Sequence, residues 1–148
     1  MSLQDQVTQQ LKAAMKAKDS VALESLRAIK SAILLAQTQA GAQDLTSDDE
    51  IKLVQKLVKQ RKDSAEIFRQ QGREDLAEPE EAQIKIIEQF LPEQLDEESI
   101  AIIVDEIITQ TNAEGMKDMG KVMGIASKQM AGKADGKTIS AIVRKKLA

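Results

Sequence analysis

Apolar residues recur every three or four positions along almost the whole chain, which is the period of an α-helix. The first stretch, for example, places Leu3, Val7 and Leu11 on one side of a helix. Only Phe68 and Phe90 are aromatic, so the core has to be built from aliphatic side chains and methionine. Such a composition favours helices over sheets. The pattern therefore predicts an all-α fold.

Start and stop signals divide this pattern into seven helices. Asp19, Asp96 and Asp135 each precede an apolar run and can cap a helix. Pro79 suits the first turn of the fourth helix, because its missing N–H would be unpaired there in any case. Gly72 is a natural end for the third. The expected helices cover about residues 3–18, 19–41, 46–72, 79–91, 96–111, 117–131 and 136–147.

The stretch "LPEQLDEES" at residues 91–99 marks a domain boundary, because it joins a proline stop to an acidic helix start. We therefore expect two helical bundles, an N-terminal four-helix domain at residues 1–92 and a C-terminal three-helix domain at residues 96–148.

The absence of cysteine and histidine excludes several classes of chemistry. The chain has no cysteine and no histidine, so that Ser/His and Cys/His triads, zinc fingers and thiol-redox sites are impossible. Carboxylate pairs such as Glu80 and Glu81 lie at helix starts, where the helix dipole accounts for them. We expect a non-enzyme without cofactor or metal. The N-terminal residues do not resemble a signal peptide, and no apolar run could span a membrane, so we expect a cytoplasmic location.

The net charge of −3 hides a strong asymmetry along the chain. Residues 93–114 contain seven acidic and no basic side chains, which gives this segment a charge of −7. Residues 115–148 contain eight basic and two acidic side chains, which gives +6. This pattern indicates a directed electrostatic surface.

The sixth helix combines a buried stripe with a basic face. Lys117, Lys121 and Lys128 cluster opposite the apolar stripe, and Gly120 and Gly124 lie between the two. The stripe consists of Met119, Val122, Met123, Ala126 and Met130.

Two glycines inside a helix cost about 1 kcal/mol each relative to alanine, so something should approach them closely. One candidate is a neighbouring helix packed into the notch that Gly120 and Gly124 form. The other is a sugar-phosphate backbone, held by Lys121 and Lys128 and by lysines of the following loop.

The segment "AGKADGKTIS" at residues 131–140 partly matches the sequence motif of a phosphate-binding P-loop. Only three residues separate Gly132 from Gly136, whereas a P-loop has four and follows a buried strand. The segment instead reads as a helix end at Gly132 in the left-handed conformation, followed by a cap at Asp135. Lys133 and Lys137 would then extend the lysine face of the sixth helix.

"MGKVMG" at residues 119–124, followed by "GKADGK" at residues 132–137, resembles the tail domain of the B subunit of tRNA-dependent (Asp/Glu-tRNA) amidotransferases. Residues 59–95 are similar to the free-standing YqeY-like proteins, in which that tail follows an N-terminal helical domain. The resemblance covers essentially the whole chain and implies four helices followed by three. The tail is associated with holding tRNA, and the free-standing proteins lack the catalytic part of the B subunit. The RNA face that the resemblance implies comprises Gly120, Lys121, Gly124, Gly132, Lys133, Asp135, Gly136 and Lys137.

The N-terminal half also carries residues typical of that family, but chemistry alone assigns them no role beyond packing and capping. Arg61 and Arg73 are either buried ion-pair anchors or part of a second contact surface. The full set is Lys59, Gln60, Arg61, Ser64, Phe68, Gly72, Arg73 and Asp75.

The resemblance, together with the basic segment and the lysine face, implies a non-catalytic tRNA-binding accessory module. We expect it to neutralise phosphates, because the chain has no Tyr or Trp for base stacking. A protein-interaction module that docks a tRNA synthetase or amidotransferase, through the acidic segment or the methionine-containing surface, is the alternative. Carbon–nitrogen ligase activity ranks third. The expected RNA-binding residues are Lys117, Gly120, Lys121, Gly124, Lys128, Lys133, Gly136 and Lys137.

Overall fold

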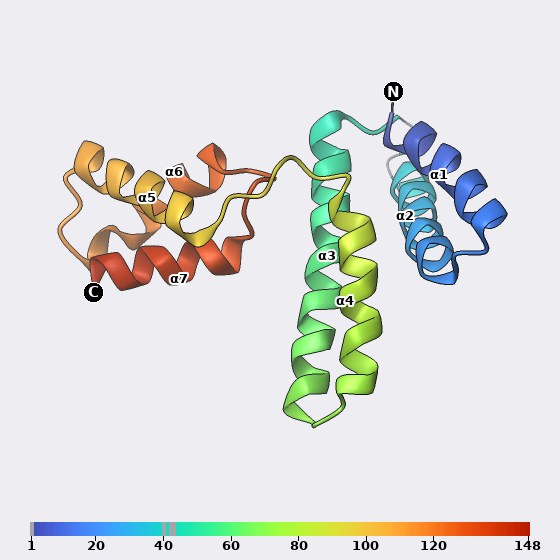
Figure 1. Ribbon diagram of the computed structural model, residues 1–148. Helices are drawn as coiled ribbons and strands as arrows, with labels where there is room; N and C mark the ends of the chain where they lie inside the picture. Colours follow the sequence, from blue (N-terminus) through green and yellow to red (C-terminus); the bar gives the residue numbers. More distant parts are fainter. Residues whose placement is uncertain (1, 40, 42–43) are drawn as a thin grey trace. The chain divides into compact units, whose positions relative to one another are not determined.

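The computed structural model describes residues 2–39, 41 and 44–148, and every regular element in these ranges is helical (Figure 1). The predicted all-α class is confirmed. None of the helices in the described ranges is long and apolar enough to cross a membrane. The elements are α1 (Leu3–Ala17), α2 (Ser20–Gln39), α3 (Ser47–Gln70), α4 (Glu74–Glu88), α5 (Glu97–Thr111), η1 (Met116–Asp118), α6 (Met119–Gln129) and α7 (Gly136–Leu147).

Predicted helix caps are present in the structure. The backbone N–H groups of Ala22, Ser99 and Thr138 donate to cap carboxylates at 3.1, 2.8 and 2.7 Å. Asp19, Asp96 and Asp135 are the respective acceptors. Each carboxylate pairs an N–H that the first turn of a helix leaves unbonded.

The predicted place of Pro79 is wrong, because α4 begins at Glu74 and holds Pro79 in its interior. Gly72, with a φ of +71°, ends the preceding helix, and the N–H of Arg73 donates to the carbonyl of Phe68 at 2.8 Å. This Schellman turn reverses the chain at once. The carbonyl of Arg73 then accepts the N–H of Ala77 at 3.1 Å, so the new helix starts directly after the turn.

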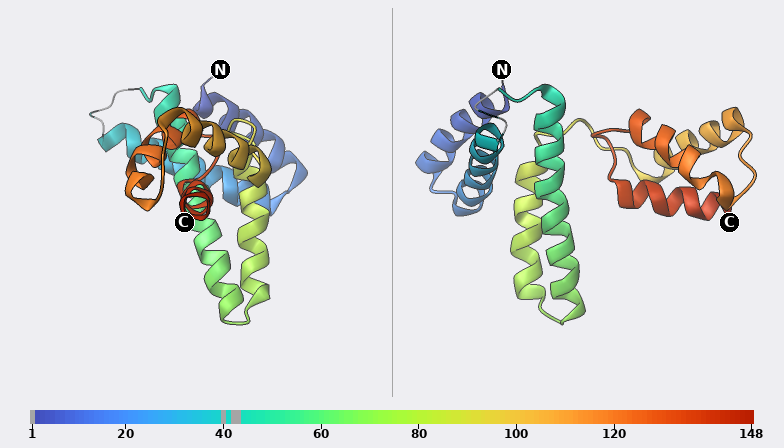
Figure 2. Two further views of the ribbon diagram at one scale, coloured as in Figure 1. Left: turned by 90° about the vertical axis from the view of Figure 1, so that its left-hand side faces the viewer. Right: turned by 180° about the vertical axis from the view of Figure 1, so that it is seen from behind.

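The chain divides into two compact units, Met1–Leu91 and Pro92–Ala148. In the first, α1 and α2 form one helical hairpin and α3 and α4 form another (Figures 1 and 2). Of the second hairpin, α4 packs more closely against α2 than α3 does. The α3–α4 hairpin extends beyond the α1–α2 pair. The fully buried residues of this core include Val7, Leu26, Ile29, Val54 and Ile87.

The second unit is a bundle in which α5, α6 and α7 each pack against the other two. The predicted stripe of α6 is confirmed, with Val122, Ala126 and Met130 fully buried and Met119 and Met123 packed partly buried beside them. The helix itself is shorter than predicted, because Met116–Asp118 forms a 3₁₀ turn and α6 ends at Gln129. The remaining core residues are Ile100, Val104, Ile107, Ala134, Ile139, Val143 and Leu147.

Candidate nucleic-acid interface

The outer side of α6 carries lysines and glycines and faces solvent. Lys121, Gly124 and Lys128 lie within about 60° of one another at 100° per residue, and Gly120 lies beside them. Lys117 belongs to the 3₁₀ turn that leads into the helix. All five residues are exposed, and we call them the lysine–glycine face.

No described helix packs against the two glycines of α6. A Cβ atom added at Gly120 or Gly124 would meet nothing within 4 Å among the residues that the structure describes. The expectation that a helix fills this notch is therefore wrong, because α5 and α7 pack against the opposite side of α6. Packing among the described residues therefore does not offset the helix-propensity cost of these two glycines.

The lysines of this face are weakly paired. Lys117 lies 3.7 Å from the carboxylate of Glu114, but both side chains are largely exposed, and such pairs contribute little. Lys121 and Lys128 have no ion-pair partner within the described ranges. Their charges are therefore available to an anionic ligand.

The loop after α6 is held in place through its backbone. Gly132 has a φ of +79°, which confirms the predicted left-handed helix end. Its carbonyl accepts a hydrogen bond from the side-chain amide of Gln94 at 2.8 Å, and the carbonyl of Lys133 accepts the N–H of Leu95 at 2.9 Å. These bonds fix the direction in which Lys133 leaves the loop.

Lys133 has a different electrostatic setting from the lysines of α6. It lines a hollow of about 380 Å³ together with Glu93 and Asp96. Because two carboxylates line the same hollow, Lys133 contributes less free positive potential than Lys121 or Lys128.

The start of α7 brings a cap and two predicted contact residues together. The carboxylate of Asp135 accepts the N–H of Thr138 at 2.7 Å, which confirms Asp135 as the cap of α7. Its place at the RNA face that the resemblance implies stays a prediction. Gly136 and Lys137 are exposed at the first two positions of α7. A Cβ at Gly136 would also meet nothing within 4 Å in the described part of the chain.

Within this unit, exposed acidic residues lie on α5 and exposed basic residues lie on α7. The sequence analysis did not include Arg144 and Lys145 among the expected RNA-binding residues. Glu98 and Glu106 on α5 are exposed, whereas α7 exposes Arg144 and Lys145 in addition to Lys137. At 100° per residue these three cations span about 100° of α7. The seven-residue spacing of Lys137 and Arg144 is the signal that could have revealed this second cationic row.

The two N-terminal arginines that the sequence singled out are not buried ion-pair anchors. Arg61 donates to the side-chain oxygen of Gln83 at 2.8 Å and to the carbonyl of Leu57 at 3.1 Å, so its partners are uncharged. Arg73 pairs with Asp75 at 3.0 Å, but these side chains are 54% and 64% exposed.

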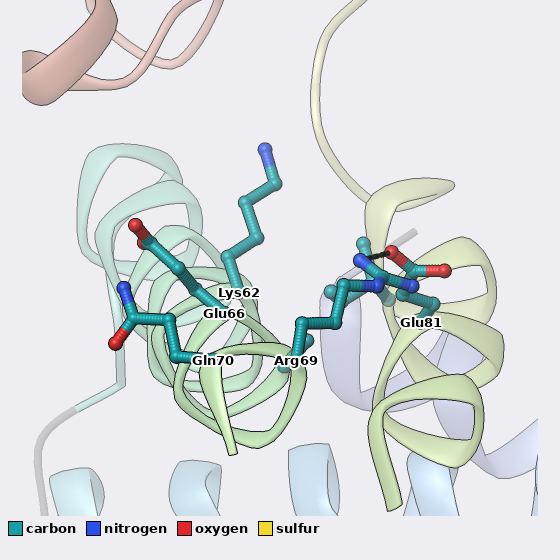
Figure 3. A pocket seen from close by; sticks show the side chains of 7 residues that line it. Lys62, Glu66, Arg69, Gln70 and Glu81 are labelled. Carbon is teal, nitrogen blue, oxygen red and sulfur yellow. Dashed lines mark hydrogen bonds and ion pairs between the residues drawn. The ribbon is translucent and has the colours of Figure 1, made fainter. Parts of the chain in front are cut away.

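Arg69 pairs with two carboxylates across the α3–α4 hairpin. It binds Glu74 through two hydrogen bonds of 3.1 Å and also pairs with Glu81 (Figure 3). These bonds raise the pKa of Arg69 and hold the pKa of Glu81 below its usual range. Arg69 and Lys62 line a hollow of about 560 Å³, and Lys62 pairs with a carboxylate of α4 at 3.9 Å. Since both cations are paired, the described residues that line this hollow offer no free cation to a ligand.

Metal ligation finds no support in the described ranges, where no group of three or more acidic side chains could hold an ion.

Comparison with known proteins places the chain in a family. The sequence profile of the YqeY-like protein family matches residues 4–147. The chain is 33% identical over 105 residues to the E subunit of glutamyl-tRNA(Gln) amidotransferase from Thermococcus gammatolerans, which covers 68% of the chain and only 17% of that relative. Its resemblance to a tRNA-dependent amidotransferase is thus confirmed, although the matched relative is an E subunit and not a B subunit.

Fungal relatives match over more of their own length. The chain is 34% identical over 127 residues to altered inheritance of mitochondria protein 41 of Pyrenophora tritici-repentis, covering 84% of the chain and 68% of the relative. It is 40% identical over 100 residues to the protein of the same name from Clavispora lusitaniae, covering 68% of the chain and 54% of the relative. The chain belongs to the YqeY-like protein family.

Proposed function

We propose that this chain is an RNA-binding accessory module that holds tRNA by its phosphate backbone through the lysine–glycine face. The observation that carries the proposal is the open space over Gly120 and Gly124 beside the unpaired Lys121 and Lys128 in the described part of the chain. The name of the Thermococcus relative, a glutamyl-tRNA(Gln) amidotransferase subunit, supports tRNA as the ligand.

Glycines and lysines together favour a polyanion that lies close to the helix. Lysines alone would bind phosphates at the tips of their side chains, away from the helix backbone. Exposed glycines alone would suit an uncharged partner helix. Gly124 lies one turn from Lys128 and less than one turn from Lys121. A phosphate strand at Gly124 would therefore approach the backbone of α6 while cations flank it on both sides.

The proposed recognition is of shape and charge. Both aromatic residues of the chain, Phe68 and Phe90, precede residue 92, so the C-terminal unit has no ring on which a base could stack. Contacts to phosphate and ribose follow the path of a folded RNA without reading its sequence. Binding of this kind weakens steeply as salt rises, because phosphate contacts release counterions.

The test is a titration of bulk tRNA at several salt concentrations, with the double variant Lys121→Glu/Lys128→Glu. The matched control is Lys12→Glu/Lys16→Glu, which reverses two exposed helical lysines of α1. We expect at least a tenfold loss of affinity in the first variant and little change in the control. Absence of binding at low salt, or equal losses in both variants, would contradict the proposal.

A tRNA synthetase or amidotransferase remains a second proposed partner, docked at the acidic segment. Ile102 on α5 is 55% exposed, with Glu98 and Glu106 one turn to either side of it. Affinity capture from lysate with and without nuclease separates the two ideas, since a protein-mediated complex survives nuclease. The cytoplasm stays a prediction for the location, because the fungal relatives carry names that include mitochondria.

A further inference from the structure

The N-terminal unit contains a groove that its own helices leave open. It runs between α2 and α3 and measures about 390 Å³. Because α2 packs more closely against α1 and α4 than against α3, the side of α2 that faces α3 is only partly covered. Ala32, Leu35 and Ala36 of α2 and Leu53 and Leu57 of α3 line the groove.

The residues that line the groove are spaced along α2 and α3 as they are in surfaces that pack against another helix. Ala32, Leu35 and Gln39 follow at intervals of three and four residues on α2, and Leu53, Leu57 and Gln60 do so on α3. Such rows are straight ridges along each helix, which suit a third helix lying between them. The alanines leave room for the backbone of that helix to come close.

Leu35 shows that the described helices of the N-terminal unit leave this surface uncovered. It is 60% exposed, the highest value among the large hydrophobic residues in the described ranges. Exposed leucine beside a groove is typical of a docking surface.

Charge on the rim specifies the kind of partner. Lys52 and Lys56 line the groove, and none of the described residues that line it carries a carboxylate. Lys52 lies near Asp49. The carboxylate of Asp49 accepts the N–H of Thr46 at 3.0 Å in the helix cap. Lys56 has no ion-pair partner in the part of the chain that the structure describes. Among the described residues that line the groove, such a helix would therefore meet two cations and no carboxylate.

We propose that the groove between α2 and α3 binds an amphipathic helix of a partner protein that carries acidic residues beside its apolar stripe. A second copy of this chain fits less well. Groove-to-groove pairing about a two-fold axis would bring Lys52 and Lys56 of both copies together. The acidic helix α5 of a second copy would offer only Ile102 as a large exposed apolar side chain within its described residues.

The direct test uses the full chain and two fluorescent synthetic helices of about four turns. One peptide has leucines at i, i+4 and i+7 flanked by glutamates, and its match has lysines in place of the glutamates. We expect the acidic peptide to bind at least tenfold more tightly by fluorescence anisotropy. The variant Lys52→Glu/Lys56→Glu should reverse this preference, and the control Lys12→Glu/Lys16→Glu should preserve it. Failure of both peptides to bind, or a preference that ignores the rim charges, overturns the proposal.

Two further measurements separate this inference from its rivals. The Lys52→Glu/Lys56→Glu variant should retain its thermal unfolding temperature and its tRNA affinity, which distinguishes the groove from the lysine–glycine face. Sedimentation velocity should show a monomer at all protein concentrations. A dimer that Leu35→Gln dissociates would mean that a second copy fills the groove, and this result would overturn the proposal.

Discussion

Gly124 and Lys128 lie one helical turn apart on the exposed face of α6, and nothing in the described ranges covers the glycine. Glycine at this position lowers the stability of the helix, and the lysine beside it is free to bind an anion. A substitution at Gly124 should therefore change the stability of the fold and the affinity for RNA in opposite directions.

Gly124→Ala should stabilise the protein and weaken RNA binding. Alanine favours the helix by about 1 kcal/mol over glycine, and open space around the new Cβ means that no clash subtracts from this gain. The same methyl group would hold a phosphate strand away from the backbone, so we expect about a tenfold loss of tRNA affinity. Urea unfolding and a tRNA titration measure the two effects. Ser31→Ala, at an exposed position of α2, should add helix stability without changing affinity. Unchanged RNA binding in Gly124→Ala would remove the main support for close phosphate approach.

Gly132→Ala should have the opposite effect on stability. Gly132 adopts a φ of +79° in the turn after α6, where a side chain with a Cβ is strained by about 1–2 kcal/mol. We expect a lower thermal unfolding temperature in this variant. Gly132→Asn provides the control, since asparagine tolerates the left-handed conformation better than alanine. Equal melting temperatures for the alanine variant and the wild type would contradict this reading of the turn.

The ion pair of Arg69 with Glu81 should make the N-terminal unit sensitive to acid. The hydrogen bond from Arg69 holds the pKa of Glu81 below its ordinary value of 4.5 in the folded protein. A carboxyl group with a lowered folded pKa stabilises the fold above its unfolded pKa, and this contribution is lost as pH falls through the folded value. The difference in urea midpoint between the wild type and Glu81→Gln should therefore be largest near pH 6 and shrink below pH 4.5. In an Arg69→Gln background, Glu81→Gln should show a smaller pH-dependent difference, because the hydrogen bond that lowers the pKa of Glu81 is then absent.

Local features of the sequence predicted the helices well, because caps and apolar spacing act over a few residues. Asp96 and Asp135 were identifiable in this way. Pro79 was misplaced because the Schellman turn at Gly72 starts α4 earlier than its apolar pattern does. Whether Gly124 is covered depends on which side of α6 faces the other two helices of the bundle, which is a property of tertiary packing.

The ion pair of Arg69 with Glu81 in the α3–α4 hairpin also could not be predicted from local sequence features. Arg69 and Glu81 are twelve residues apart, and they meet only because of the register that the turn at Gly72 imposes. Arg73, nearer to that turn, has the more obvious sequence signal but pairs only with Asp75 at the surface. Charge partners between helices therefore require the structure, whereas caps within a helix do not.

The cationic row of α7 should contribute to the salt dependence of tRNA binding. Arg144 and Lys145 are exposed on the same unit as the lysine–glycine face, and each phosphate contact changes the slope of log K against log salt by about 0.7–0.9. Arg144→Ala/Lys145→Ala should therefore reduce the magnitude of this slope by about 1.5 if both side chains bind phosphates. Lys12→Ala/Lys16→Ala removes two exposed lysines of α1 and should leave the slope unchanged. An unchanged slope in the α7 variant would restrict the RNA contact to α6 and the loop that follows it, because counterion release counts only those charges that meet phosphates.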